Sequence, residues 1–201
     1  MRVIAGEFRG RKLLPPEGET TRPITDRVKQ SLFDILTPRL EGAIVWDLFA
    51  GTGSLGLESL SRGAEQAVFF ETDRSAVARL RRNIEALGLR RDRAVVQPTD
   101  VFLLGPLPEY RERKKAAISA GPPNADIIFL DPPYRYLTDQ PEDLRRLGRL
   151  FARQHLRPEG IVVFRHDAGD ALELPGLTRY DERSYGGMML EFLAVAKPIG
   201  E

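Results

Sequence analysis

The sequence predicts an α/β fold, a mostly parallel sheet of seven strands covered by helices on both faces. Two observations predict it. Short apolar segments of strand length alternate with helical segments from Ala43 to Phe164, a pattern typical of parallel sheets. The last segment, Leu177–Ala196, lacks a long helical pattern and contains Gly186-Gly187 between two strand-like stretches, which predicts a C-terminal antiparallel hairpin.

Residue patterns place the elements in order. Apolar runs of strand length and amphipathic stretches that end at glycine define them. The expected strands are Ala43–Phe49, Ala67–Glu71, Ala94–Gln97, Asp126–Leu130 and Ile161–Phe164, and the expected helices are Ser54–Arg62, Ser75–Leu87 and Leu144–Leu156. In the second helix, Val77, Leu80 and Ile84 share one face, which predicts that this face packs on the sheet.

Two segments stand outside this alternation. Residues 1–20 read as a small β-hairpin, with Arg2–Ala5 and Arg11–Leu14 flanking a turn that contains Gly6 and Gly10. Residues 105–124 form a long loop with basic residues, which predicts either a functional loop or partial disorder. The expected organisation is therefore an N-terminal hairpin extension, residues 1–20, followed by one domain over residues 21–201.

Composition excludes several classes of protein. The chain has 201 residues, no cysteine and two histidines, so disulfides, thiolate chemistry and a histidine-rich metal site are not expected. Its longest apolar run, Phe192–Ala196, cannot span a membrane, and the N-terminus lacks a signal-peptide pattern. We expect a cytoplasmic protein that binds neither a membrane nor a metal.

The charge is nearly balanced but is dominated by arginine. Thirty basic and 29 acidic residues give a net charge of +1, and 25 of the basic residues are arginine. Arginine presents a planar fork of donors to phosphate, so this composition is compatible with a nucleic-acid ligand. A GC-rich genome or a thermophilic host explains the same skew.

A glycine loop follows the first expected strand. Gly51, Gly53 and Gly56 have the spacing of a dinucleotide-binding loop, in which a pyrophosphate rests on a helix N-terminus. Asp47 at the end of the strand would repel a pyrophosphate, but it suits an ammonium or sulfonium group. The alternative is that Asp47 is a helix-capping or loop residue.

Further acids end the next two strands. Glu71 has the spacing at which a carboxylate reaches a ribose, and Asp100 could receive an adenine amino group beside Val101. Together with Asp47 and the glycine loop, these acids predict an S-adenosylmethionine site that uses no metal and releases S-adenosylhomocysteine. The residues expected to bind this cofactor are Thr25, Asp47, Phe49, Ala50, Gly51, Gly53, Leu55, Glu71, Thr72, Asp100 and Val101.

Asp131-Pro132-Pro133-Tyr134 follows the fourth expected strand. The prolines fix the backbone and leave carbonyl acceptors. The Asp131 carboxylate and the Pro132 carbonyl can accept both hydrogens of an exocyclic base amine, which frees its lone pair for a methyl donor. Tyr134 can stack on the base. We therefore expect these four residues to be catalytic; an ordinary turn is the alternative.

At these motifs the chain resembles RsmD-type enzymes, bacterial methyltransferases that modify N2 of a guanine in 16S ribosomal RNA. The resemblance rests on residues 2–13, 21–36, 47–58 and 129–134. It implies the Rossmann-like fold of class I methyltransferases, and a helix from Arg22 to Leu36 that closes over the methionine end of the cofactor. It also implies a partner, small-subunit ribosomal RNA or its assembling particle, and we expect the enzyme to be a monomer.

A basic patch on the N-terminal hairpin is a candidate RNA contact, with a solvated surface as the alternative. The residues expected to bind RNA are Arg2, Arg9, Arg11, Lys12, Arg22 and Arg27. Thr25 and Arg27 could instead belong to a simple helix start, and both histidines are expected to be structural.

Three other functions remain open. A DNA adenine-N6 or cytosine-N4 methyltransferase would share the Asp131 motif but would usually need a target-recognition region. A non-catalytic RNA-binding assembly factor would retain the fold with a vestigial pocket. A nicotinamide-dependent oxidoreductase is disfavoured by Asp47 and by the Asp131 motif.

Overall fold

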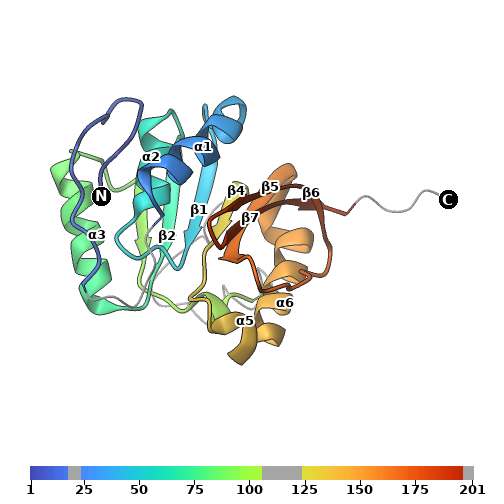
Figure 1. The fold of residues 1–201 in the computed structure, drawn as a ribbon. Coiled ribbons are helices and arrows are strands. Elements are labelled where there is room, and N and C mark those ends of the chain that lie inside the picture. Colours follow the sequence, from blue (N-terminus) through green and yellow to red (C-terminus); the bar gives the residue numbers. More distant parts are fainter. Residues whose placement is uncertain (18–23, 106–123, 197–201) are drawn as a thin grey trace. The chain divides into compact units, whose positions relative to one another are not determined.

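The computed structural model describes residues 1–17, 24–105 and 124–196, and its described part contains a seven-stranded sheet (Figure 1). The strand order is β3-β2-β1-β4-β5-β7-β6. The pairs β1–β2, β2–β3 and β4–β5 are parallel, and β7 pairs antiparallel with β5 and β6. This confirms the predicted mostly parallel sheet with a C-terminal hairpin. No helix in the described ranges has the length and apolar character needed to cross a membrane.

The chain divides into two compact units, of which the first is Met1–Val101. Its parallel strands are β1 (Ile44–Leu48), β2 (Gln66–Phe70) and β3 (Ala94–Gln97), and its helices are α1 (Asp26–Leu36), α2 (Ser54–Ser61) and α3 (Arg74–Ala86), with a short 3₁₀ turn η1 (Thr37–Arg39). Every residue of β1 is buried, as expected for a strand covered on both faces. Trp46 and Phe70 pack with ring centroids 5.3 Å apart.

Local sequence explains where the helices of this unit begin. The Thr25 hydroxyl accepts a hydrogen bond from the Val28 amide at the start of α1, and the Asp73 carboxylate accepts one from the Ala76 amide at the start of α3. Such side chains satisfy amides that have no partner within the helix. Thr25 therefore caps the helix start, and its contact with the cofactor stays a prediction.

The N-terminal segment, residues 1–17, folds back as predicted, but it forms a single antiparallel bridge between Arg2 and Lys12 and no regular strands. Backbone hydrogen bonds join Val3 to Arg11 and Leu13 to Met1 across the turn. The cause is the turn itself, in which Gly6 and Gly10 both have φ +81° and bend the chain after a few residues.

The second unit is Phe102–Glu201. Its described elements are β4 (Ala125–Leu130), α5 (Tyr136–Asp139), α6 (Pro141–Leu150), the π-helical turn η3 (Phe151–His155), β5 (Leu156–Asp167), β6 (Leu177–Tyr185) and β7 (Met188–Val195). A further 3₁₀ turn, η2 (Val101–Leu103), begins at the last residue of the first unit. The predicted loop at residues 105–124 falls almost wholly outside the described residues.

The predicted helix Leu144–Leu156 differs from the structure at both ends. Helix α6 begins three residues earlier because Pro141 occupies a first-turn position, where a missing amide costs nothing. Its regular turns end at Leu150, and the π-helical turn then leads directly into β5, which starts at Leu156 opposite Ala125. The sequence did not predict this early strand start, because the exposed residues Arg157 to Glu159 interrupt the apolar pattern.

Candidate active site

The glycine loop after β1 has an unusual backbone. Phe49, Gly51 and Gly53 have φ of 57°, 54° and 86°, so three left-handed residues fall within five positions. A left-handed phenylalanine is uncommon and costs of order 1–3 kcal/mol, and such strain is concentrated at functional sites. Hydrogen bonds from Ala50 N to the Phe70 carbonyl, 3.0 Å, and from Gly53 N to the Ala50 carbonyl, 2.8 Å, hold the loop against the end of β2.

Asp47 lies near the end of β1, just before this loop, and is only 2% exposed. Its Oδ2 accepts a hydrogen bond of 2.8 Å from the Gly56 amide in the first turn of α2. A carboxylate is stabilised there by the free amides and by the helix dipole. The capping contact that the sequence allowed is therefore present, and contact with a cationic ligand remains a prediction.

The Glu71 carboxylate ties the end of β2 to the glycine loop. Its Oε2 accepts a hydrogen bond from Gly51 N, and its Oε1 accepts hydrogen bonds from Thr72 N and Asp73 N, all at 2.8 Å. A carboxylate can accept about four hydrogen bonds, so it retains capacity for a hydroxyl group. Its orientation is therefore fixed before any ligand binds.

The glycines of the loop differ in what surrounds them. A Cβ at Gly53 would lie 2.4 Å from Leu80 Cδ1, and one at Gly56 would lie 2.3 Å from Phe69 Cε1, so both glycines are required by packing. A Cβ at Gly51 would meet no atom within 4 Å, so this glycine faces open space beside Glu71. An open backbone beside an oriented carboxylate fits the ribose of a nucleoside cofactor such as S-adenosylmethionine.

The other residues expected to bind the cofactor lie in the segments that follow β1, β2 and β3. Thr72 is exposed directly after Glu71, and Ala50 is half-buried in the loop. Asp100 is half-buried after β3, whereas Leu55 and Val101 are buried, at 6% and 2% exposure. The buried apolar residues could support the ligand, and the half-buried acid could accept a hydrogen bond from its polar edge. Contact of these residues with the cofactor stays a prediction.

In the second unit, Asp131 directly follows β4 and forms an ion pair with Arg165 of β5. The Arg165 Nε donates to Asp131 Oδ1 at 2.6 Å, and the Arg165 and Asp131 side chains are 9% and 19% exposed, respectively. Burial raises the pKa of the Asp131 carboxyl above its ordinary value, and the charge and hydrogen bond of Arg165 oppose that rise. Arg165 thus favours the ionised form of a buried carboxylate and fixes one of its oxygens.

The rest of the motif turns the chain into α5. Pro132 is buried, and the carbonyls of Pro133 and Tyr134 accept hydrogen bonds from Tyr136 N, 2.8 Å, and Leu137 N, 3.1 Å. Two carbonyls of the motif are therefore used by the turn. Tyr134 is half-buried at this turn, where an aromatic ring can present a face to a ligand.

Sequence reasoning missed Arg165, although a signal existed. It is a charged residue directly after the apolar run Ile161–Phe164, in the same strand, and it is 7% exposed. Buried charges need a partner, so this position indicated an acid nearby. Which acid it pairs with depends on the β4–β5 register, in which Leu130 lies opposite Phe164.

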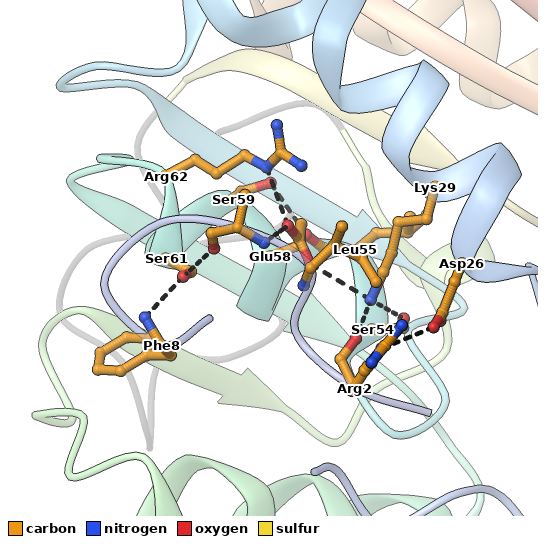
Figure 2. A network of polar contacts seen from close by, with 12 residues as sticks. Arg2, Phe8, Asp26, Lys29, Ser54, Leu55, Glu58, Ser59, Ser61 and Arg62 are labelled. Atoms are coloured by element: carbon orange, nitrogen blue, oxygen red, sulfur yellow. Dashed lines mark hydrogen bonds and ion pairs between the residues drawn. The ribbon is translucent and has the colours of Figure 1, made fainter. Parts of the chain in front are cut away.

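A second buried ion cluster, also missed, lies in the first unit (Figure 2). Lys29 Nζ lies 3.3 Å from Glu58 Oε2, with exposures of 1% and 0%, and the Arg62 Nε donates to Glu58 Oε1 at 2.9 Å. Lys29 also donates to the Arg2 carbonyl at 2.6 Å. Burial lowers the pKa of Lys29, and the Glu58 charge opposes this effect.

This cluster holds the N-terminal segment in place. The Glu58 carboxylate accepts hydrogen bonds from the amides of Ile4, 2.8 Å, and Ala5, 3.0 Å, and the Ser61 hydroxyl donates to the Ala5 carbonyl at 2.6 Å (Figure 2). The segment is therefore anchored by a buried charge and is not a loose arm.

The residues expected to bind RNA have different environments. Arg2 is paired with Asp26 at 2.8 Å, and the Arg11 guanidinium donates to the Ala86 carbonyl. Arg9, Lys12 and Arg27 are not buried. Arg22 lies outside the described residues. Within the described ranges, no group of three or more metal-ligating side chains is assembled.

Both histidines are buried in the second unit, at 3% exposure for His155 and 2% for His166. His155 lies 3.3 Å from the Gly105 carbonyl, and its burial lowers its pKa. His166 Nε2 lies 3.8 Å from Glu191 Oε1. These contacts agree with the structural role expected for both residues.

Comparison with known proteins gives the class and the family. The family model described as "Conserved hypothetical protein 95" matches residues 1–194. "Ribosomal RNA small subunit methyltransferase D" of Haemophilus influenzae is 34% identical over 178 residues, which are 87% of this chain and 83% of that protein.

Solved structures agree with this result. A hypothetical protein of Thermus thermophilus is 31% identical, with a TM-score of 0.73 over 97% of this chain and 99% of that chain. The structure of SMU.776, solved with S-adenosylhomocysteine, is 16% identical and shares the fold, with a TM-score of 0.61 over 83% of this chain and 49% of that chain.

The fold is the Rossmann-like fold of methyltransferases, as the likeness to solved methyltransferase structures shows. Within that class, the chain belongs to the Conserved hypothetical protein 95 family, and the resemblance to RsmD-type methyltransferases is confirmed.

Proposed function

We propose that this protein transfers a methyl group from S-adenosylmethionine to the exocyclic N2 of a guanine in small-subunit (16S) ribosomal RNA. The observation that carries the proposal is the Asp131-Pro132-Pro133-Tyr134 turn at the carboxyl end of β4, with its carboxylate held by Arg165. The relative named as a small-subunit ribosomal RNA methyltransferase supports the RNA substrate.

The cofactor is assigned to the first unit. Glu71 would accept a hydrogen bond from a ribose hydroxyl, and Gly51 would allow close approach to the backbone, since its open face lies beside that carboxylate. Asp100 and Val101 would receive the adenine. When bound, S-adenosylmethionine supplies an electrophilic methyl group on a sulfonium.

The target amine is assigned to the motif in the second unit. Asp131 Oδ1 is engaged by Arg165, so we assign Oδ2 to one N–H of the guanine amine. Because the Pro133 and Tyr134 carbonyls are used in the turn, we assign the Pro132 carbonyl to the other N–H. These two acceptors orient the nitrogen lone pair, and orientation of this kind supplies a large part of the rate enhancement.

Tyr134 would stack on the guanine ring, a contact worth ~1–3 kcal/mol per base. A guanine within a helix would have to leave its stack to reach this turn. Arg2, Arg9, Arg11, Lys12, Arg22 and Arg27 remain proposed RNA contacts. We further propose that the protein acts as a cytoplasmic monomer on the RNA or on its assembling particle.

The direct test incubates the protein with methyl-labelled cofactor and with unmethylated small-subunit RNA, assembled particles or duplex DNA. We expect label on guanine in the RNA or the particle, located by mass spectrometry. Label on DNA adenine or cytosine, or cofactor binding without any labelled nucleotide, would contradict the proposal.

A further inference from the structure

A groove runs along one face of α3 in the first unit. Arg74, Val77, Ala78 and Arg81 line one wall, and their spacing places them on a single helical face. Thr72, which is also expected to contact the cofactor, and Pro98 line the other wall, from the chain after β2 and β3. The groove has a volume of about 240 Å³, with apolar side chains between two arginines.

The groove arginines belong to a strongly basic helix, in which Arg82 likewise has no ion pair within the described ranges. Helix α3 carries four arginines against a single acid, Glu85. Arg79 is paired with Glu17, and Arg90, after the helix, is paired with Asp92. Within the described ranges, no ion pair or hydrogen bond involves the guanidinium of Arg74 or Arg81. Two positive charges thus line one groove, and no acid among the described residues pairs with either of them.

The N-terminal segment fixes α3 from another side. Residues 11–17 run along the helix in the opposite direction, as Figure 1 shows. Arg11 donates to the Ala86 carbonyl, Leu14 exchanges two hydrogen bonds with Asn83, and Ser75 donates to Glu17. The arginine face is therefore held on a rigid helix, so little ordering is required when a ligand binds.

We infer that this groove binds a phosphodiester of the RNA substrate, an inference that rests on the proposed function. Two guanidinium forks can hold a phosphate through charge-assisted hydrogen bonds. Val77, Ala78 and Pro98 would contact the adjoining sugar. S-adenosylmethionine carries no phosphate and is itself cationic, so paired arginines are unsuited to it, and the groove is assigned to the RNA backbone.

The test compares two double variants that each remove two positive charges. Arg74→Ala/Arg81→Ala alters the groove. Arg90→Ala/Arg149→Ala alters two exposed arginines outside it, one of which is helical. For both proteins and the wild type, circular dichroism checks the fold, calorimetry measures cofactor affinity, and fluorescence anisotropy measures affinity for small-subunit RNA at several salt concentrations.

We expect the groove variant to bind RNA about tenfold more weakly, with cofactor affinity unchanged. Its plot of log affinity against log salt should be shallower by about 0.7, the contribution of one neutralised phosphate of single-stranded RNA. The control variant should stay within about twofold of the wild type.

Three results would overturn the inference: wild-type RNA affinity and salt slope in the groove variant, an equal loss in the control variant, or a loss of cofactor affinity. If the wild type methylates RNA and the groove variant matches it, the inference fails while the proposed function stands. If the wild type neither binds nor methylates RNA, both fail.

Discussion

At the scale of single residues, the reaction that we propose depends on one carboxylate. Replacing Asp131 with Asn removes its charge but keeps its shape. We expect kcat for RNA methylation to fall by about 10²–10³, the usual cost of losing one preorganised electrostatic contact to the transition state. Cofactor affinity, measured by calorimetry, should remain within about twofold, because the cofactor is assigned to the other unit. Near-normal turnover would remove Asp131 from the mechanism.

Arg165 is a positioning residue, and its role should be visible in the pH profile. Burial raises the pKa of Asp131, and Arg165 opposes that rise. In Arg165→Ala the pKa should therefore rise further, so that the acidic limb of kcat/KM moves to higher pH. Arg165→Lys should restore part of the shift, since it returns the charge. A profile that falls in amplitude without moving would indicate that Arg165 only supports the fold.

Two neighbouring glycines offer a contrast between folding and binding. Both have positive φ, so alanine costs about 1–2 kcal/mol at either position. At Gly53 the added methyl also meets Leu80, which adds about 1–3 kcal/mol of overpacking. We expect Gly53→Ala to lower the free energy of urea unfolding more than Gly51→Ala does. Gly51→Ala should instead weaken cofactor binding disproportionately, and equal effects of both changes on binding would contradict the assignment of the open face.

At the scale of elements, the Lys29–Glu58–Arg62 cluster decides whether the N-terminal segment stays attached. Removing one member of a buried ion pair costs about 3–5 kcal/mol, because the other charge is left without a partner. We expect Glu58→Gln to lower the free energy of unfolding by about that amount. It should also speed hydrogen exchange at Ile4 and Ala5, whose amides donate hydrogen bonds to the Glu58 carboxylate. The matched control is Glu65→Gln, an exposed acid, which should change neither quantity. Unchanged exchange at Ile4 and Ala5 in Glu58→Gln would show that the segment is held by other contacts.

The sequence predicted most elements because their signals are local. Apolar runs indicated the strands, Gly63 and Gly88 marked helix ends, and Gly186-Gly187 marked the last hairpin. Motif spacing likewise located Asp47, Glu71 and Asp131 at strand ends. What could not be predicted depends on pairing between distant residues. Lys29 reads as a surface lysine within α1 until Glu58, 29 positions later, is found buried against it, and Arg165 has no assigned partner until the register is known.

At the scale of the whole molecule, stability should depend on pH through His166 and Glu191. Burial opposes the charge on each, but their mutual attraction and neighbouring groups prevail, so the pKa of His166 is raised above 6.5 and that of Glu191 is lowered below 4.5. The contribution of His166 is therefore fully present below pH 6.5 and is lost as pH rises through its raised pKa. The contribution of Glu191 is present above pH 4.5 and is lost as pH falls through its lowered pKa.

We therefore expect the free energy of urea unfolding to decline as pH rises above 6.5. The total decline should be larger the further the pKa of His166 is raised. In Glu191→Gln this part of the decline should flatten, because the carboxylate that raises the pKa is gone. Nuclear magnetic resonance titration of the His166 ring provides an independent readout. A wild-type His166 whose pKa is at or below 6.5 would contradict the prediction.

The anchoring of the N-terminal segment also constrains the order in which the chain folds. Its contacts with Glu58, Ser61 and Asn83 join residues 53 to 69 positions apart. Closing such long loops costs entropy before any contact is gained, so contacts of this kind form late. Although these residues are synthesised before α2 and α3, they have nowhere to dock until those helices exist. The side of α3 that they brace is thus completed after the parallel strands have begun to assemble.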